Sequence, residues 1–447
     1  MRVLVLCDDT YHAGKTVREG LAPLEEGGLS FVFWEDGRGL TPQGLDPYSL
    51  VILSKSDQRT MEDDTPWLTG ESLNALEEFV KEGGGLLAVH SGTCYDGNER
   101  MERLLGGVFL THPAQCPVTL TPCEEESPLM EGVPPFPITD EFYVMRLCDR
   151  TATVHATLES AHGSQPAVWT RKYGLGRVCC VTPAHNPQSW SAPGFQTLLK
   201  NAVHFCTKPV GTALVTGAGR GLGFGLTESL LRRNWQVVAG EYDSTASFLP
   251  RLSEEFPHRL WVTPLDVTDP DSIQAAGKYT AGTVGTLDLL ISNAGVYGRH
   301  EDDRYESGLH PDEMLWDYRV NALGPVLLLE AFAPRMEQSG LRRVCVVSSE
   351  AGSIGACWRD NAFGYSMSKA AVNMGTQIWF HCLRPKGYTF RLYHPGYLRT
   401  YMLGEKNLAA DLEPEEGARL ALSYFLSDRQ NEDALALYSY DGREYPW

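Results

Sequence analysis

The sequence predicts an α/β protein of two domains, each a three-layer α/β/α sandwich. Apolar strand-like runs alternate with segments of helical spacing in both halves of the chain. This alternation favours mostly parallel sheets covered by helices. A length of 447 residues fits two or three domains. The composition changes at a short Lys-Pro linker around 207–210, so we expect domains at 1–207 and 211–447.

The first domain begins with a strand at Val3–Cys7, and further strands are expected at 30–36, 49–55 and 85–90. Residues 72–84 carry apolar side chains at helical spacing and end in glycines, which predicts a helix.

In the second domain, the expected strands all end in polar or small residues. They lie at 212–217, 236–243, 259–266, 287–295 and 342–350, with a helix at 223–234. Because ligands bind at the carboxyl ends of parallel strands, we expect the functional residues at these ends.

The composition argues against several classes of binding partner. The net charge is −19 and both halves are acidic, which argues against nucleic acid and anionic membranes. No stretch approaches the ~18 apolar residues of a membrane span, and Val3–Cys7 is too short for a signal peptide. We therefore expect a cytoplasmic protein. The eleven cysteines include no C-x-x-C pair, so neither a zinc site nor a disulfide framework is predicted.

The segment TGAGRGLG at 216–223 lies between a strand and a helix. Glycines in this context allow close approach of a pyrophosphate to the helix N-terminus, which predicts a dinucleotide site. Glu241, at the end of the next strand, can accept hydrogen bonds from ribose hydroxyls and repel a 2′-phosphate. NAD is therefore favoured over NADP, although Arg220 could attract that phosphate.

Residues 211–447 resemble the short-chain dehydrogenase/reductase family, which has a Rossmann fold. The matching motifs are T-G-x-x-x-G-x-G at 216–223, Asn-Ala-Gly at 293–295, Ser-Ser at 348–349, Tyr-x-x-x-Lys at 365–369, and Pro395-Gly396 followed by Thr400. The resemblance implies an oxidoreductase that interconverts an alcohol and a carbonyl with NAD or NADP.

The catalytic residues follow from the chemistry of hydride transfer, which leaves an alkoxide that needs a proton. A phenol with a pKa of about 10 is a poor base at neutral pH. A lysine at i+4 shares its helix face, and its positive charge, with that of an oxidised nicotinamide, favours the phenolate. We therefore expect Tyr365 to be the general acid/base. Lys369 is expected to lower the pKa of Tyr365 and to bind the nicotinamide ribose.

The resemblance assigns further roles. Ser349 is expected to hydrogen-bond the substrate oxygen, with Ser348 as the alternative. Sixteen residues separate Ser349 from Tyr365, more than the family's dozen or so, so we expect a longer loop beside the pocket. Asn321 either holds a proton-relay water or marks a helix kink. The expected cofactor-binding residues are Thr216, Gly217, Gly219, Arg220, Gly221, Leu222, Gly223, Glu241, Asp266, Val267, Asn293, Ala294, Gly295, Tyr365, Lys369, Pro395, Gly396 and Thr400.

Residues 1–207 resemble the ThuA-like (trehalose utilisation) family, whose fold is that of class I glutamine amidotransferases, a flavodoxin-like arrangement. The matching segments are 75–92, 104–113, 138–144, 167–178 and 184–190. Amidotransferases carry a nucleophilic cysteine at the strand-to-helix elbow, where this chain has His90. Glutamine hydrolysis is therefore disfavoured. Cys94 is expected to be a packed thiol, and Ser91 is an unsupported nucleophile.

The candidate site of this first domain consists of dispersed polar residues. Histidines and carboxylates of this kind can move a proton at a sugar carbon or bind a metal, or they can simply hydrogen-bond loops. No H-E-x-x-H spacing occurs, so we predict no metal. The candidates are His12, His90, His112, Asp140, Glu141 and His185.

Two functional hypotheses remain. In the first, a bifunctional enzyme of carbohydrate metabolism oxidises or reduces a sugar or polyol, and the ThuA-like domain processes or binds the same class of compound. In the second, a carbonyl reductase carries a non-catalytic binding or assembly module. Both involve a small-molecule substrate, and the reductase resemblance implies a homo-oligomer. The substrate loops at 297–312 and 397–413 do not reveal the substrate.

Overall fold

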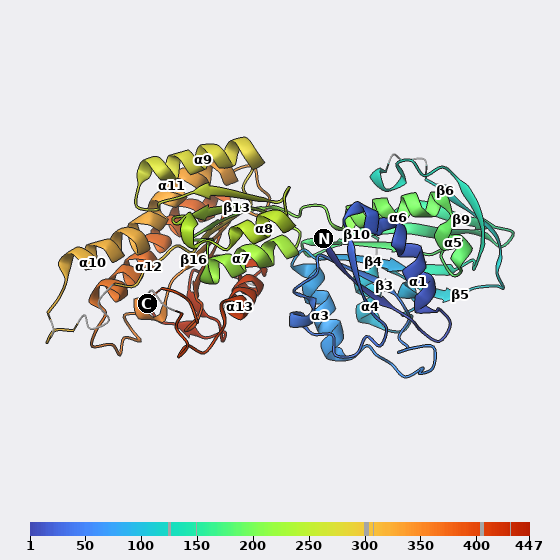
Figure 1. Cartoon of the computed structure of the whole chain (residues 1–447), viewed down its shortest axis with the longest axis horizontal. Coiled ribbons are helices and arrows are strands. Elements are labelled where there is room, and N and C mark those ends of the chain that lie inside the picture. Colours follow the sequence, from blue (N-terminus) through green and yellow to red (C-terminus); the bar gives the residue numbers. More distant parts are fainter. Residues whose placement is uncertain (124–126, 149, 299–303, 307, 403–405, 430) are drawn as a thin grey trace. The chain divides into compact units, whose positions relative to one another are not determined.

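The computed structural model describes the chain except residues 124–126, 149, 299–303, 307, 403–405 and 430. Parts of both predicted substrate loops thus lie outside the described residues. The chain divides into two compact units, one of Met1–Val210 with Arg232–Asn234 and one of Gly211–Leu231 with Trp235–Trp447 (Figure 1).

The N-terminal unit is built on a nine-stranded sheet of order β2-β1-β3-β4-β11-β10-β9-β6-β7. The first five strands of this order are parallel, and the remaining pairings are antiparallel. The sheet is therefore less parallel than the sequence predicts, because residues 116–173 return through hairpins instead of helices. A separate antiparallel pair is formed by β5 and β8. The strands are β1 (Arg2–Cys7), β2 (Ser30–Trp34), β3 (Leu50–Ser54), β4 (Gly85–Val89), β5 (Gly107–Thr111), β6 (Cys116–Pro122), β7 (Phe136–Asp140), β8 (Val144–Leu147), β9 (Thr153–Ser160), β10 (Gly163–Tyr173) and β11 (Gly176–Val181).

Helices cover both faces of this sheet. Val3 and Val5 of β1 belong to one apolar cluster with α1 and α6, whereas Leu4 and Leu6 belong to a second cluster with α3 and α4. This alternation is the two-residue period of a strand buried on both faces. The helices are α1 (Gly14–Leu21), α2 (Pro42–Leu45), α3 (Gly70–Lys81), α4 (Glu99–Leu105), α5 (Pro187–Ser191) and α6 (Pro193–Cys206).

The C-terminal unit contains an eight-stranded sheet of order β14-β13-β12-β15-β16-β17-β18-β19. All its pairings are parallel except that of β18 with β19. The strand order reverses between β12 and β15, which creates the crevice where dinucleotides bind in such sheets. The strands are β12 (Thr212–Thr216), β13 (Gln236–Glu241), β14 (Leu260–Pro264), β15 (Leu289–Ser292), β16 (Arg343–Val347), β17 (Thr389–His394), β18 (Leu437–Ser439) and β19 (Glu444–Tyr445).

Helices flank this second sheet as well, and α9, α11 and α12 share one apolar cluster with its strands. The predicted fold class, two α/β/α domains, is confirmed. Among the described residues, no helix has the length and apolarity needed to cross a membrane. The helices are α7 (Gly221–Arg232), α8 (Leu249–Glu255), α9 (Pro270–Val284), α10 (Pro311–Tyr318), α11 (Gly324–Met336), α12 (Phe363–Leu383) and α13 (Pro414–Leu426).

Candidate functional site

The glycine-rich turn joins β12 to α7 and needs its glycines for steric reasons. Gly217 has φ +64, and a Cβ there would lie 2.9 Å from Ala294 Cα. A Cβ on Gly223 would lie 2.1 Å from the Gly217 carbonyl oxygen. The Asn293 side chain donates to the Thr216 carbonyl at 2.9 Å, which ties the turn to the end of β15.

A cavity of about 860 Å³ opens at the carboxyl ends of these strands. Its walls include every predicted cofactor-binding residue except Thr216. The predicted catalytic residues Tyr365, Lys369 and Ser349 also line it, whereas Asn321 does not.

Glu241 indicates what the nucleotide end of the cavity can bind. Among the described residues, none hydrogen-bonds its buried Oε2 atom. Ribose hydroxyls of a bound nucleotide would supply the missing donors, so these residues fit a nicotinamide dinucleotide. Asp243 lies beyond Glu241, and hydrogen bonds from Thr245, together with the charge of Arg220, lower the pKa of Asp243. The ribose end therefore carries the carboxylates of Glu241 and Asp243 together with the Arg220 guanidinium.

Tyr365 and Lys369 lie near the start of α12 and line the cavity, where Lys369 is buried and Tyr365 is half-buried. Lys369 Nζ is 5.7 Å from the centre of the Tyr365 ring and donates to the Val347 carbonyl at 3.2 Å. Burial raises the pKa of Tyr365 to about 12, although a hydrogen bond with Ser349 opposes it. Without the charge of an oxidised nicotinamide, burial thus outweighs the nearby charges, and the lowered phenol pKa expected with that cofactor bound stays a prediction.

Burial also perturbs the lysine. It lowers the pKa of Lys369 to about 8, and the negative charge of Asp317 acts in the opposite direction. The ammonium thus lies in a site that stabilises it poorly until another polar group arrives.

The two serines after β16 differ in their partners. The Ser348 hydroxyl donates to Asn373 Oδ1 at 2.5 Å, which occupies it within the protein. The Ser349 hydroxyl hydrogen-bonds Tyr365 and accepts the Ala351 amide at 3.1 Å. Of the pair, Ser349 is therefore the one whose hydroxyl lies beside that of Tyr365, and its contact with a substrate oxygen stays a prediction.

Asn321 lies in a π-helical turn, Arg319–Leu323, between α10 and α11. Its Nδ2 donates to the Val296 carbonyl at 2.8 Å and to Ser368 Oγ at 3.0 Å, and its Oδ1 accepts the Val296 amide. These bonds give it a structural role at the kink. A relay water on Asn321 stays a prediction.

The longer loop after Ser349 contributes Trp358 and Arg359 to the cavity wall. Arg359 forms an ion pair with Glu350, which lines the same cavity. The unusual spacing in the sequence was the signal for this loop.

Sequence reasoning missed His394, which ends β17 and lines the cavity. Burial lowers the pKa of His394 to about 4, so the ring is neutral at pH 7. Its position directly before Pro395-Gly396 was the available signal. Aromatic side chains that were also missed complete the wall, and they are Tyr297, Trp316 and Tyr397.

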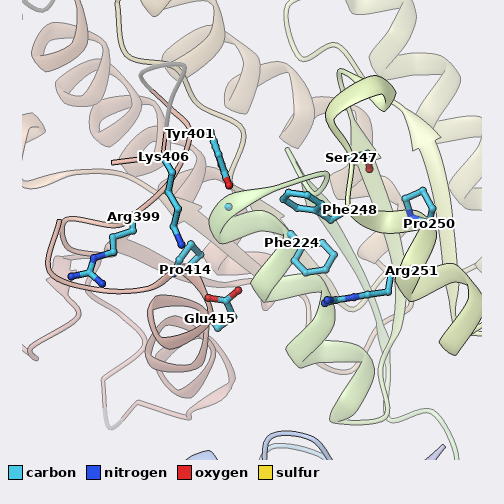
Figure 2. Close-up of a pocket in the computed structure, with 11 residues that line it drawn as sticks. Phe224, Ser247, Phe248, Pro250, Arg251, Arg399, Tyr401, Lys406, Pro414 and Glu415 are labelled. Atoms are coloured by element: carbon cyan, nitrogen blue, oxygen red, sulfur yellow. The ribbon is translucent and has the colours of Figure 1, made fainter. Parts of the chain in front are cut away.

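A second pocket of about 410 Å³ lies beside α7 (Figure 2). Its cations already have partners within the chain. Arg399 and Lys406 contact Glu413 at 3.0 and 2.9 Å, and Arg251 lies over the Phe224 ring at 5.2 Å. This pocket therefore offers little charge to a phosphate.

In the N-terminal unit, the structure brings the predicted polar residues together at the ends of several strands. Glu141 Oε2 lies 3.3 Å from His185 Nδ1, 3.4 Å from His90 Nε2 and 3.7 Å from His112 Nε2. The His12 ring centre is 4.8 Å from that of His90.

The Asp140 side chain hydrogen-bonds backbone amides of the loops around the cluster. Its buried carboxylate accepts the amides of Glu141, Ala184 and His185 at 2.7 to 3.2 Å. It therefore positions two of the loops that carry the cluster.

The elbow after β4 has the strained geometry expected of a functional turn. His90 has φ +50, and a Cβ on Gly92 would lie 1.9 Å from the Leu53 carbonyl oxygen. Burial raises the pKa of the Cys94 thiol to about 12. Cys94 is thus a poor nucleophile at neutral pH.

Comparison with known proteins assigns both parts of the chain. Residues 2–206 match the ThuA family model, described as trehalose utilisation, and residues 211–411 match the model described as short chain dehydrogenase.

Three proteins of similar sequence each cover about half of this chain or less. Short-chain dehydrogenase RED3 of Pyricularia oryzae is 30% identical over 251 residues, which covers 53% of this chain and 98% of the relative. C-signal of Myxococcus xanthus is 36% identical over 166 residues, 36% of this chain and 94% of that protein. An NADPH-bound carbonyl reductase structure from chicken fatty liver is 30% identical with a TM-score of 0.48, and covers 53% of this chain and 98% of its own. Through its C-terminal part this chain belongs to the short-chain dehydrogenase family, oxidoreductases that use a nicotinamide cofactor, and a ThuA-like domain precedes that part.

Proposed function

We propose that the protein interconverts a carbonyl and an alcohol on a sugar, polyol or related ring compound, and that its ThuA-like domain binds or processes the same class of compound. The proposal depends on the observation that Tyr365, Ser349 and Lys369 line the same cavity as the glycine-rich turn. The proposal favours NAD over NADP, because Glu241 and Asp243 would repel a 2′-phosphate.

The roles of the residues follow from their contacts. The bound nicotinamide supplies or accepts the hydride. The Ser349 hydroxyl donates a hydrogen bond to the substrate oxygen and orients the carbonyl. Tyr365, with its pKa raised to about 12, is protonated at neutral pH and donates its phenolic proton to that oxygen. Lys369 holds the cofactor ribose, whose hydroxyls offer the acceptors that its buried ammonium needs.

The protonation state of Tyr365 bears on the direction of reaction. A neutral phenol is ready to give a proton, as reduction of a carbonyl requires. Alcohol oxidation requires the phenolate, which is scarce at pH 7 while the pKa stays near 12. Carbonyl reduction therefore needs no prior deprotonation of Tyr365 at neutral pH.

The substrate end of the cavity supports a ring-shaped compound. Tyr297, Trp316, Trp358 and Tyr397 offer flat faces for C–H groups, and Glu350 with Arg359 offers polar atoms for hydroxyls. The aromatic wall also supports the second candidate, a reductase of apolar ketones whose ThuA-like domain is a non-catalytic module.

A substrate panel distinguishes the two candidates. Purified protein is given sugars, keto-sugars, polyols and apolar ketones with NADH and NADPH in turn, and nicotinamide absorbance is followed. The proposal expects the highest kcat/KM on a keto-sugar or cyclic polyol-derived ketone with NADH. Activity confined to apolar ketones would overturn the sugar assignment and favour the second candidate.

A further inference from the structure

Four ligand-type side chains of the ThuA-like domain converge on one point. One nitrogen each of His12, His90 and His185 and one oxygen of Glu141 lie within 4.8 Å of one another. We propose that these four side chains bind a divalent transition-metal ion, and that Zn²⁺ suits the set best. This inference is independent of the reductase site and differs from the expectation of no metal.

The spacing of the ligand atoms fits a tetrahedral ion. Zn²⁺ bonds to His nitrogen and carboxylate oxygen at about 2.0–2.1 Å, so tetrahedral ligand atoms lie about 3.3 Å apart. Glu141 Oε2 is 3.3 Å from His185 Nδ1 and 3.4 Å from His90 Nε2. Small shifts of the remaining pairs, all within 4.8 Å, would complete the shell.

Hydrogen bonds behind the histidines orient them as metal ligands. The buried Asp9 carboxylate contacts His12 Nδ1 at 2.7 Å, which places the proton on Nδ1 and leaves a lone pair on Nε2. The Thr182 carbonyl accepts a hydrogen bond from His90 Nδ1 at 2.7 Å. This contact likewise places the proton on Nδ1 and leaves a lone pair on His90 Nε2. Carboxylate and carbonyl partners of this kind support most metal-bound histidines.

Two buried ring nitrogens of the cluster, His12 Nε2 and His185 Nδ1, lack a hydrogen bond among the described residues, and a cation would supply the missing partner. A buried lone pair without a donor costs free energy, and a metal ion would accept it. The net negative charge of Glu141 and Asp9 in this region also favours a cation.

The backbone is built to bring these ligands together. His12, His90, Glu141 and His185 follow β1, β4, β7 and β11, and each lies within five residues of the end of its strand. Left-handed backbone at Asp8, His90 and Ala184, with φ of 74°, 50° and 109°, borders the cluster. Such strain is retained where surrounding structure holds a functional geometry.

Two further side chains, those of Tyr143 and His112, lie beside the proposed position of the ion. The Tyr143 hydroxyl lies 2.9 Å from His90 Nε2 and must give up this contact when the ion binds. His112 Nε2 lies 3.7 Å from Glu141 Oε2, and its Nδ1 donates to the Pro113 carbonyl at 2.8 Å. His112 is more exposed than the four ligands, so it faces the side from which water or a substrate hydroxyl would reach the ion.

The test is metal binding by the full-length, untagged protein. The protein is dialysed against a chelator and titrated with Zn²⁺ by calorimetry, and with Co²⁺ by visible absorbance. We expect one high-affinity ion per chain, tetrahedral-type Co²⁺ bands, and a higher melting temperature with Zn²⁺. His12→Gln, Glu141→Gln and His185→Gln should each weaken Zn²⁺ binding at least tenfold.

His162→Gln is the matched control, because His162 lies on the exposed turn between β9 and β10; it should bind Zn²⁺ as the unaltered protein does. Melting curves recorded without metal establish that each ligand variant is folded. Absence of stoichiometric binding, or equal affinity in folded ligand variants and the control, would overturn the site.

Discussion

Lys369 is a buried ammonium group to which the proposed function gives a central role in the reductase site. Its Nζ donates to the Val347 carbonyl at 3.2 Å, and the negative charge of Asp317 acts on it. Buried charges are costly unless they are paired. The burial of Lys369 therefore lowers the stability of the folded protein and is retained for function. Two predictions follow at the scale of single residues.

Replacing Lys369 with methionine should stabilise the protein while it abolishes turnover. The pKa of Lys369 falls from 10.5 to about 8 in the folded protein, so folding disfavours the charged form below pH 8. The gain in the free energy of unfolding should be about 1 to 3 kcal/mol at pH 7. It should shrink as the pH rises from about 8 towards 10.5, because the lysine then loses its proton in the folded protein. Urea unfolding at several pH values measures this, and an unchanged or lower stability at pH 7 would contradict it.

Glu241 should control the choice of cofactor. Glu241→Gln keeps the size of the side chain but removes the negative charge that repels a 2′-phosphate. The ratio of NADPH to NADH affinity should rise at least tenfold, as measured by fluorescence titration of each cofactor. Glu254→Gln, an exposed change on α8, should leave the ratio unchanged. A ratio that is the same in both variants would show that Glu241 does not contact the ribose.

At the scale of elements, α12 combines the catalytic face with an exposed apolar stripe. Tyr365 and Lys369 face the cavity, whereas Met367, Met374 and Ile378 are 57 to 63% exposed. Successive members of this set are seven and four positions apart, so the three side chains share one face of the helix. An exposed apolar stripe of this kind favours a protein–protein interface.

We predict that this stripe forms a contact between copies of the chain. Met374→Glu and Ile378→Glu together should shift the protein to a smaller species in light scattering after gel filtration. Gln377→Glu adds charge to a half-buried polar position of the same helix, and it should leave the mass unchanged. A wild-type protein that is monomeric at micromolar concentration would contradict the prediction.

The elements also show what sequence patterns can and cannot convey. Runs such as 85–90 and 342–350 predict strands because apolar residues end in small polar ones, and β4 and β16 lie there. The antiparallel strands from β6 to β10 were not predicted, because their pairing depends on residues far apart in the chain. The raised pKa of Tyr365 escaped prediction for a similar reason, since burial is a property of the folded protein.

At the scale of the whole molecule, the chain combines two α/β domains with separate clusters of reactive side chains. The sequence predicted about half of the residues that line the reductase cavity, since the spacing of the family motifs is local. The His12, His90, Glu141 and His185 cluster could be named residue by residue but not as one site, because its members come from four loops. Only the fold brings their nitrogen and oxygen atoms together.

The independence of the two sites is itself testable in the full-length protein. Tyr365→Phe should leave Zn²⁺ binding unchanged, and Glu141→Gln should leave carbonyl reduction within about twofold of the unaltered protein. If the ThuA-like domain is catalytic, the Tyr365→Phe protein should still convert a keto-sugar without any change in nicotinamide absorbance. Chromatography of the sugar products measures this conversion. Its absence, with Zn²⁺ bound, would favour a binding module.

The most direct test of the account is turnover of the Tyr365→Phe protein with the best carbonyl of the substrate panel. Loss of the phenolic proton should lower kcat by at least about 10²-fold, the scale of general acid catalysis, while NADH affinity stays within about twofold. Tyr297→Phe is the matched control, because its ring lies 4.8 Å from that of Tyr365 and is assigned no proton transfer. Turnover of Tyr365→Phe equal to that of the control would contradict the central claim that Tyr365 supplies the proton.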